Sequence, residues 1–196
     1  MADNDRVLSA GPASGDGRNR GSDLCTQCGL CCMGVIHRVA ALDGDEIAAA
    51  SALGLEVLPT ERPLFALPCP RLEGTICQVY GSRPRTCGRY KCQVLQDLEA
   101  GVATMDEARR RTTNARRLLG DLREVMPEHM SHVDARRLAY AEVTEETVAA
   151  TGLSRSATHR LKLLATALDL YIDKFFRRPT DRKAFHLASL GEGKKE

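Results

Sequence analysis

The sequence contains no tryptophan, and aromatic residues make up only 4% of its 196 residues. A core with so few large rings must be built mainly from Leu, Ala and Val, which suggests helices packed closely on small side chains. No run of residues approaches the ~20 apolar residues of a membrane-spanning helix. The first 23 residues also lack the apolar core of a signal peptide. We therefore expect a soluble, cytoplasmic protein with no membrane partner.

An excess of charge of either sign is also missing. The formal net charge is +2, which excludes binding to nucleic acid through the charge of the whole surface. The arginines of the C-terminal half are interleaved with Asp and Glu, as on a solvated helix face. No aromatic residues lie between these arginines to stack on bases. We therefore expect no nucleic-acid partner.

Cysteine is confined to one part of the chain, because all eight cysteines lie between Cys25 and Cys92. Disulfides do not persist in a reducing compartment, so metal ligation explains these residues better. The first four form the run Cys25-Thr-Gln-Cys28-Gly-Leu-Cys31-Cys32. A C-x2-C step lets two thiolates reach one ion from a tight turn, as in zinc knuckles and iron–sulfur loops. The other four follow at wider spacings: Cys69, Cys77, Cys87 and Cys92.

Basic residues accompany the later cysteines. Between Cys69 and Cys92 there are five Arg and Lys residues and a single acid, Glu73. A thiolate must be deprotonated to bind metal, and nearby cations lower its pKa. This segment therefore suits metal ligation; the alternative is that its arginines form a solvated face. The candidates for contacts around the metal centre are Tyr80, Arg83 and Arg89.

The spacing also predicts how the thiolates divide between centres. Neighbouring side chains on an extended backbone point in opposite directions, so Cys31 and Cys32 should serve different ions or different faces of one cluster. The first three cysteines of the run should converge on one centre, with Cys69 or Cys87 as the fourth ligand. Cys32 should join the remaining three or bridge to them. The alternative is that adjacent cysteines on a tight turn bind one metal together.

The order of these cysteines resembles the family typified by YkgJ, which is known by its CxxCxxCC signature and described as zinc- or iron-chelating. The resemblance covers Leu24 to Cys92. Besides the eight cysteines it includes Pro70 after Cys69, Tyr80 three residues after Cys77, and Arg83-Pro84. Arg71 and Gly88 depart from the common form, and neither is a ligand. The resemblance implies that the eight cysteines bind zinc or an iron–sulfur cluster.

Several functions follow from this resemblance, and the sequence leaves them open. The favoured one is an iron–sulfur protein in electron transfer, as a component of an oxidoreductase with a redox partner protein. The first alternative is a structural zinc module for protein interaction, in which metal replaces a hydrophobic core. Flagellin lysine methylases resemble the family in cysteine pattern, but a Gly-rich turn for a methyl donor is missing here. Nucleophilic catalysis by a cysteine with His37 as base is a further alternative, so whether the chain is an enzyme stays open.

We expect an α+β fold in four parts. These are a disordered segment over residues 1–23, a small loop-rich cysteine domain over 24–92, a helical region over 93–190 and a disordered tail over 191–196. Asp43 and Glu46 predict a capping box at the start of a short helix that ends at Gly54. Short strands are expected over 65–67 and 75–80, around a hairpin turn at Glu73-Gly74.

The helical region is expected to form a bundle of three or four segments. Apolar residues at three- and four-residue steps predict a helix from Met105 to Met126, closed by Pro127, and a second one over 156–176. Shorter helices are expected over 133–141 and 145–150. His129 and His132 have no third candidate ligand close by in sequence, so we expect both to be ordinary surface histidines.

Overall fold

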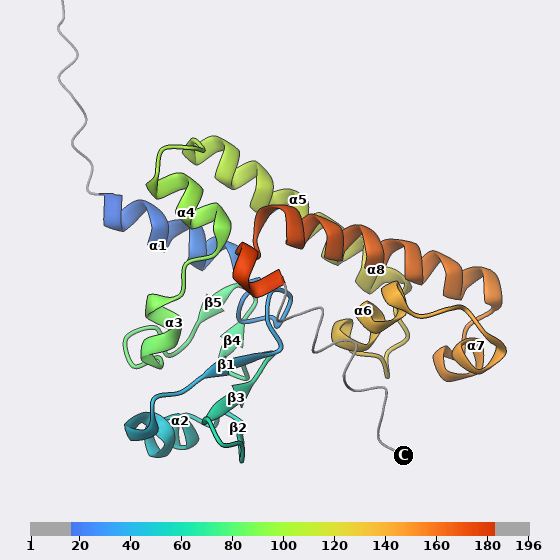
Figure 1. Cartoon of the computed structure of the whole chain (residues 1–196), viewed down its shortest axis with the longest axis horizontal. Coiled ribbons are helices and arrows are strands. Elements are labelled where there is room, and N and C mark those ends of the chain that lie inside the picture. The colour runs from blue at the N-terminus through green and yellow to red at the C-terminus, as the bar shows by residue number, and fades with distance from the viewer. Residues whose placement is uncertain (1–16, 183–196) are drawn as a thin grey trace, which may run out of the picture.

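The computed structural model describes residues 17–182. It has a mixed α+β fold, as predicted, with small strands and short helices first and long helices afterwards. In Figure 1 the strands, α2 and α3 form one end of the molecule, and the long helices α5 and α8 extend away from it. Among these residues, no helix combines the length and the apolar character needed to cross a membrane.

Two small sheets support the cysteine-bearing part. β3 (Leu64–Ala66) lies between β1 (Val39–Ala41) and β2 (Val57–Leu58) and pairs antiparallel with both. β4 (Leu72–Glu73) and β5 (Ile76–Cys77) form a separate antiparallel hairpin. The predicted turn is therefore present, with Gly74 at a φ of 60°, but its strands differ from those expected. A two-residue turn pairs its immediate neighbours, and residues 65–67 instead contribute to the other sheet.

The short helix of this part begins as its sequence predicts. Asp43 and Glu46 form a capping box at the 3-10 turn Gly44–Glu46, and α2 (Ile47–Ala52) follows directly. Gly54, at a φ of 73°, ends the helical segment in the left-handed conformation that glycine adopts most readily. A further short helix, α3 (Arg85–Arg89), begins after Pro84 and was not predicted.

Five helices make up the rest of the described chain: α4 (Gln93–Glu99), α5 (Met105–Val125), α6 (His132–Tyr140), α7 (Glu145–Thr151) and α8 (Arg155–Phe175). The last four confirm the predicted helices, and α4 was missed. Each of these four begins at a Ser or Thr whose hydroxyl accepts a backbone N–H of the first turn. α8 packs against both α5 and α6, which makes it the central helix of the bundle (Figure 1).

The first described helix corrects one prediction. α1 spans Gly17–Cys28, so the part of the expected disordered segment over 17–23 is helical. The helix packs against α4 and α5, and its Leu24 is only 4% exposed. Tertiary packing of this kind stabilises a helix whose own sequence favours it little. Residues 1–16 and the predicted tail 191–196 lie outside the described residues.

The main core crosses the predicted boundary between the cysteine domain and the helical region. It joins Leu30, Val35 and Ile36, each 0% exposed, to the buried faces of α5, α6 and α8. A second, much smaller core contains Leu42, Ala50, Leu55 and Phe65 beside the three-stranded sheet. The division of the chain at residues 92 and 93 therefore stays a prediction, to be tested by unfolding.

If the main core unfolds as one unit, Leu30→Ala will destabilise the long helices as well as the cysteine turn. We expect the free energy of unfolding to fall by about 2–5 kcal/mol, because the change leaves a cavity in a close-packed core. Thermal unfolding followed by far-ultraviolet circular dichroism measures this loss. Leu163→Ala, at a position that is 71% exposed on α8, is the matched control and should change stability by less than about 0.5 kcal/mol. Helices that melt as in the unchanged protein would support a boundary at residue 92.

Candidate metal centre

All eight cysteines line a single cavity of about 290 Å³. They reach it from the end of α1, the turn after it, the hairpin, α3 and the start of α4, and all eight are free thiols. Cys25 and Cys87 are exposed, Cys92 is buried, and the other five are intermediate. Segments up to 67 residues apart in sequence thus bring their thiols to one place.

The turn after α1 brings the first four thiols together. The Gly29 N–H donates to the Cys25 carbonyl at 3.2 Å, and the Gly34 N–H donates to the Cys31 carbonyl at 3.0 Å. Gly29 has a φ of 69°, and a Cβ there would lie 3.2 Å from the backbone of Thr75. Only glycine therefore fits this close approach without strain.

Burial raises the pKa of the thiols in the first group. The pKa of Cys28 is raised to about 12, mainly by burial and also by the charges of Cys92 and Cys25. The Leu30 N–H, which points at the Cys28 sulfur, lowers this pKa in part. The pKa of Cys31 lies well above its usual value, also mainly because of burial. Among the neighbouring charges, that of Cys92 raises it most. The pKa of Cys92 rises to about 11 through burial, opposed by the N–H groups of Leu95 and Val94.

The remaining thiols repel one another in a second group. Burial raises the pKa of Cys32 to about 11, and the charges of Cys69 and Cys77 add to the increase. The pKa of Cys87 rises to about 12, through burial and then through the charges of Cys32 and Cys69. Cys69 is also tied to this group by its backbone, since its N–H donates to the Cys32 carbonyl at 2.7 Å.

These neighbours divide the thiols into two sets of four. The first set is Cys25, Cys28, Cys31 and Cys92, and the second set is Cys32, Cys69, Cys77 and Cys87. The two cores show the same division, because Cys28, Cys31 and Cys92 belong to the main core and Cys69 packs on the small one. The sets meet at Cys31 and Cys32, and Cys25 also lies near Cys32.

Among the later four cysteines, Cys92 is the one whose charge acts on Cys28 and Cys31. The expectation that Cys69 or Cys87 is the fourth ligand of the first centre stays a prediction. The N–H of Gln93, the residue after Cys92, donates to the Phe176 carbonyl at 2.9 Å, so the end of α8 fixes the start of α4. Spacing along the chain could not predict the place of Cys92, because a contact between residues 83 positions apart decides it.

The chemistry of these side chains fits the metals that the sequence suggested. Thiolates are soft ligands that select zinc and iron–sulfur clusters, and backbone N–H groups that point at three of the sulfurs stabilise their charged form. Within residues 17–182, no three His, Cys, Asp or Glu side chains already stand as a group that could hold an ion. The thiols therefore surround a cavity without converging on one point.

Two of the three predicted neighbours of the thiols line the cavity. The Arg83 guanidinium stacks on the Tyr80 ring, 3.7 Å from its centroid. Its charge opposes the rise in pKa of thiols from both sets, Cys25 and Cys32 among them. Arg89 instead extends into solvent and pairs with Asp43, Nη1 to Oδ2, at 3.5 Å.

A polar group beside the first set was missed from the sequence. The Tyr90 hydroxyl donates to Asp181 at 3.2 Å, and Arg178 donates twice to the same carboxylate at 2.7 and 2.8 Å. His37 packs edge-on against Tyr90, with ring centroids 4.9 Å apart, and burial lowers its pKa. A reactive cysteine needs a lowered pKa, whereas burial raises the pKa of the thiols nearest to Tyr90, Cys31 and Cys92.

The comparison with known families agrees with this chemistry. Residues 24–113 match the family model CxxCxxCC, described as "Putative zinc- or iron-chelating domain". The resemblance predicted from the cysteine order is thereby confirmed, and the match continues past Cys92 into α5. No curated protein and no solved structure matches the chain.

The raised thiol pKa values predict that metal binding releases protons. Burial raises the pKa of all four thiols of the first set, so at about pH 7.5 they are protonated, and a divalent ion bound by these four should displace about four protons. Affinity should therefore rise with pH and fall as the solution is acidified. Anaerobic calorimetry with zinc in two buffers of different ionisation enthalpy measures the number released. Fewer than about one proton per ion would contradict ligation by these thiols.

Proposed function

From this zinc- or iron-chelating domain, we propose that the chain holds two metal centres, each bound by one set of four cysteines, and that both are iron–sulfur clusters with a redox role. The observation that carries the proposal is the arrangement of eight thiols around one cavity in two sets of four. A cluster places its iron and sulfide between the cysteine sulfurs, so it suits thiols that surround a space.

The residues around the thiols support a role in electron transfer. Donors to the cysteine sulfurs and the extent of burial set the potential of such a centre. The first set lies against the main core, with N–H groups pointing at Cys28 and Cys92. The second set lies beside the small core and includes the exposed Cys87. Two centres in such different surroundings would have different potentials, and a redox partner protein would reach them most readily at Cys25 or Cys87.

A structural zinc module is the second candidate, and the size of the small core favours it. Only four buried residues support the three-stranded sheet in the described chain. Bound zinc would supply folding free energy that so small a core lacks. Either metal needs reduced thiols, and all eight are free. We therefore propose the cytoplasm, where thiols stay reduced, as the location.

Purification without oxygen, followed by analysis of iron, zinc and acid-labile sulfide, separates these candidates. Two iron–sulfur clusters predict sulfide in amounts similar to iron and a visible absorption that is bleached reversibly by a reductant. Two zinc ions per chain without sulfide would overturn the redox proposal and support the structural module. A protein that takes up neither metal after anaerobic reconstitution would overturn both.

The division into two sets makes a prediction about single cysteines. Cys92→Ser should remove the first centre and Cys87→Ser the second, so each variant should keep about half of the metal, since serine is a poor substitute for a thiolate on a soft metal. Metal per chain, measured by elemental analysis of the reconstituted protein, tests this. The two variants are controls for each other, and circular dichroism reports whether α5 and α8 are intact. If either variant loses all metal while staying folded, the thiols form a single joint centre.

A further inference from the structure

The backbone between the cysteine turn and β1 is held by buried side chains of distant helices. Arg136 of α6 donates from Nη1 to the Val35 carbonyl at 2.8 Å. Arg177, just beyond α8, donates from Nε to the next carbonyl, that of Ile36, at 3.2 Å. The segment they bind begins three residues after Cys32. Both arginines are almost completely buried, at 3% and 0% exposed.

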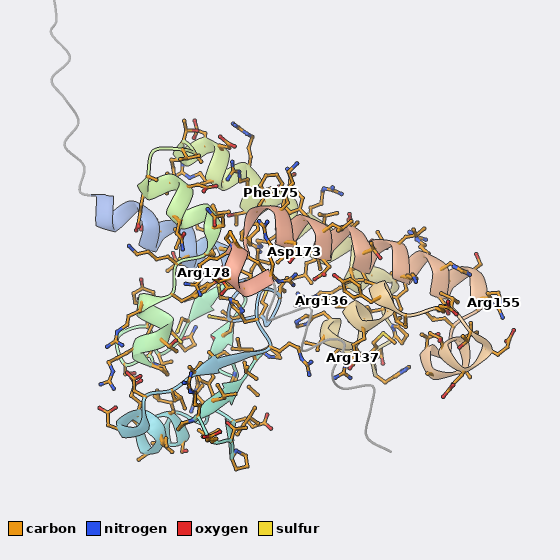
Figure 2. The ribbon with its side chains drawn as sticks, viewed as in Figure 1. Arg136, Arg137, Arg155, Asp173, Phe175 and Arg178 are labelled. Carbon is orange, nitrogen blue, oxygen red and sulfur yellow. The ribbon has the colours of Figure 1, made fainter. Side chains whose placement is uncertain are left out.

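One carboxylate joins the two arginines. Asp169 of α8, 1% exposed, accepts from Nε of Arg136 at 2.9 Å and from Nη2 of Arg177 at 2.8 Å. The hydroxyl of Tyr140 also donates to it, and Asp173 pairs with Arg177 one helical turn away. Figure 2 labels Arg136 on α6 and Asp173 on α8, on the side where these helices meet.

A third side chain reaches the preceding residue. His132 is 7% exposed, which corrects the expectation that it is a surface histidine, whereas His129 is exposed as predicted. Its imidazole faces the Gly34 carbonyl. Three donors from α6 and the end of α8 thus address three consecutive carbonyls, those of Gly34, Val35 and Ile36.

We propose that this group, the carbonyl clamp of His132, Arg136, Asp169 and Arg177, positions the cysteine turn for metal. The backbone hydrogen bonds within the turn run between residues 25 and 35, so they shape the turn but do not attach it to the helical bundle. The clamp fixes the chain directly after them to the central helix of the bundle. The helical region thereby acts on the metal centre without contributing a ligand. This inference rests on the proposed metal binding.

The test uses the full chain and cobalt(II), whose thiolate absorption bands report geometry whether the native metal is zinc or iron. Arg136→Lys keeps a positive charge beside Asp169. A lysine, however, cannot donate to Asp169 and to the Val35 carbonyl at the same time with the geometry of a guanidinium. We expect cobalt affinity to fall about tenfold, as for other groups that orient metal ligands. Amide exchange of residues 33–38 should become faster, while α5 keeps its protection. Arg137→Lys, the same change at the exposed neighbouring arginine, which pairs with Asp134, is the matched control.

Other outcomes are equally decisive. Unchanged cobalt affinity in a folded Arg136→Lys variant would overturn the proposal, even if residues 33–38 exchange faster. If that variant does not fold, His132→Gln replaces it, because this change leaves the ion pairs intact, and the same criteria apply. If the unchanged protein binds no cobalt, the proposed metal function fails. The clamp is then judged by exchange alone, and equal exchange in the Arg136→Lys and Arg137→Lys variants would overturn it.

Discussion

Asp169 is a carboxylate in the middle of an almost aromatic-free core, and it can be buried there because two guanidinium groups and a tyrosine hydroxyl surround it. With Asp173 the group contains two cations and two anions, so no net charge is left in the interior. Removing one partner of such a group costs about 3–5 kcal/mol, because the others stay buried and unpaired. Each of the two arginines also donates to a backbone carbonyl, Arg136 to that of Val35 and Arg177 to that of Ile36. The bundle and the cysteine turn therefore depend on each other for their hydrogen bonds.

Because the bundle and the cysteine turn hold each other in place, the thiols can be both buried and close together. A buried thiolate is costly, and burial is the largest cause of every raised thiol pKa here. Four thiolates around one point would repel each other strongly unless a metal neutralises them. The fold thus holds the buried thiols in a state that favours the neutral form, and a metal ion must displace their protons to bind, so its affinity falls as the pH is lowered. The positive charge of Arg83, close to thiols of both sets, offsets part of the remaining negative charge.

Local signals in the sequence predicted much of this fold. The Asp43 and Glu46 pair, the apolar repeat from Met105 to Met126 and Pro127 are local signals, and the helices that they predict agree with the structure to within one or two residues. Features decided by distant contacts were not predictable. The place of Cys92 depends on Phe176, and β3 pairs with two strands that both precede it in sequence, one on each side of it in the sheet. In the sequence, Arg136 and Arg177 look like charged residues on a solvated helix face, because the carbonyls that they bind belong to a distant segment. The same reason explains why His132 was wrongly expected on the surface.

Cys31 and Cys32 are neighbours in the chain but belong to different sets, so the two sets are joined through one peptide bond. Cys31 packs on the main core with Cys28 and Cys92, while Cys32 is bound through its carbonyl to Cys69 of the other set. The two thiols have different neighbours, Cys92 and Cys28 for Cys31, but Cys69 and Cys77 for Cys32, so one dipeptide contributes to both sets. Each set includes one exposed thiol, Cys25 in the first and Cys87 in the second. Arg136, Asp169 and Arg177 hold the segment that follows this pair against the bundle, so the proposed clamp would keep the thiols on either side of the pair in a fixed relation to the helices.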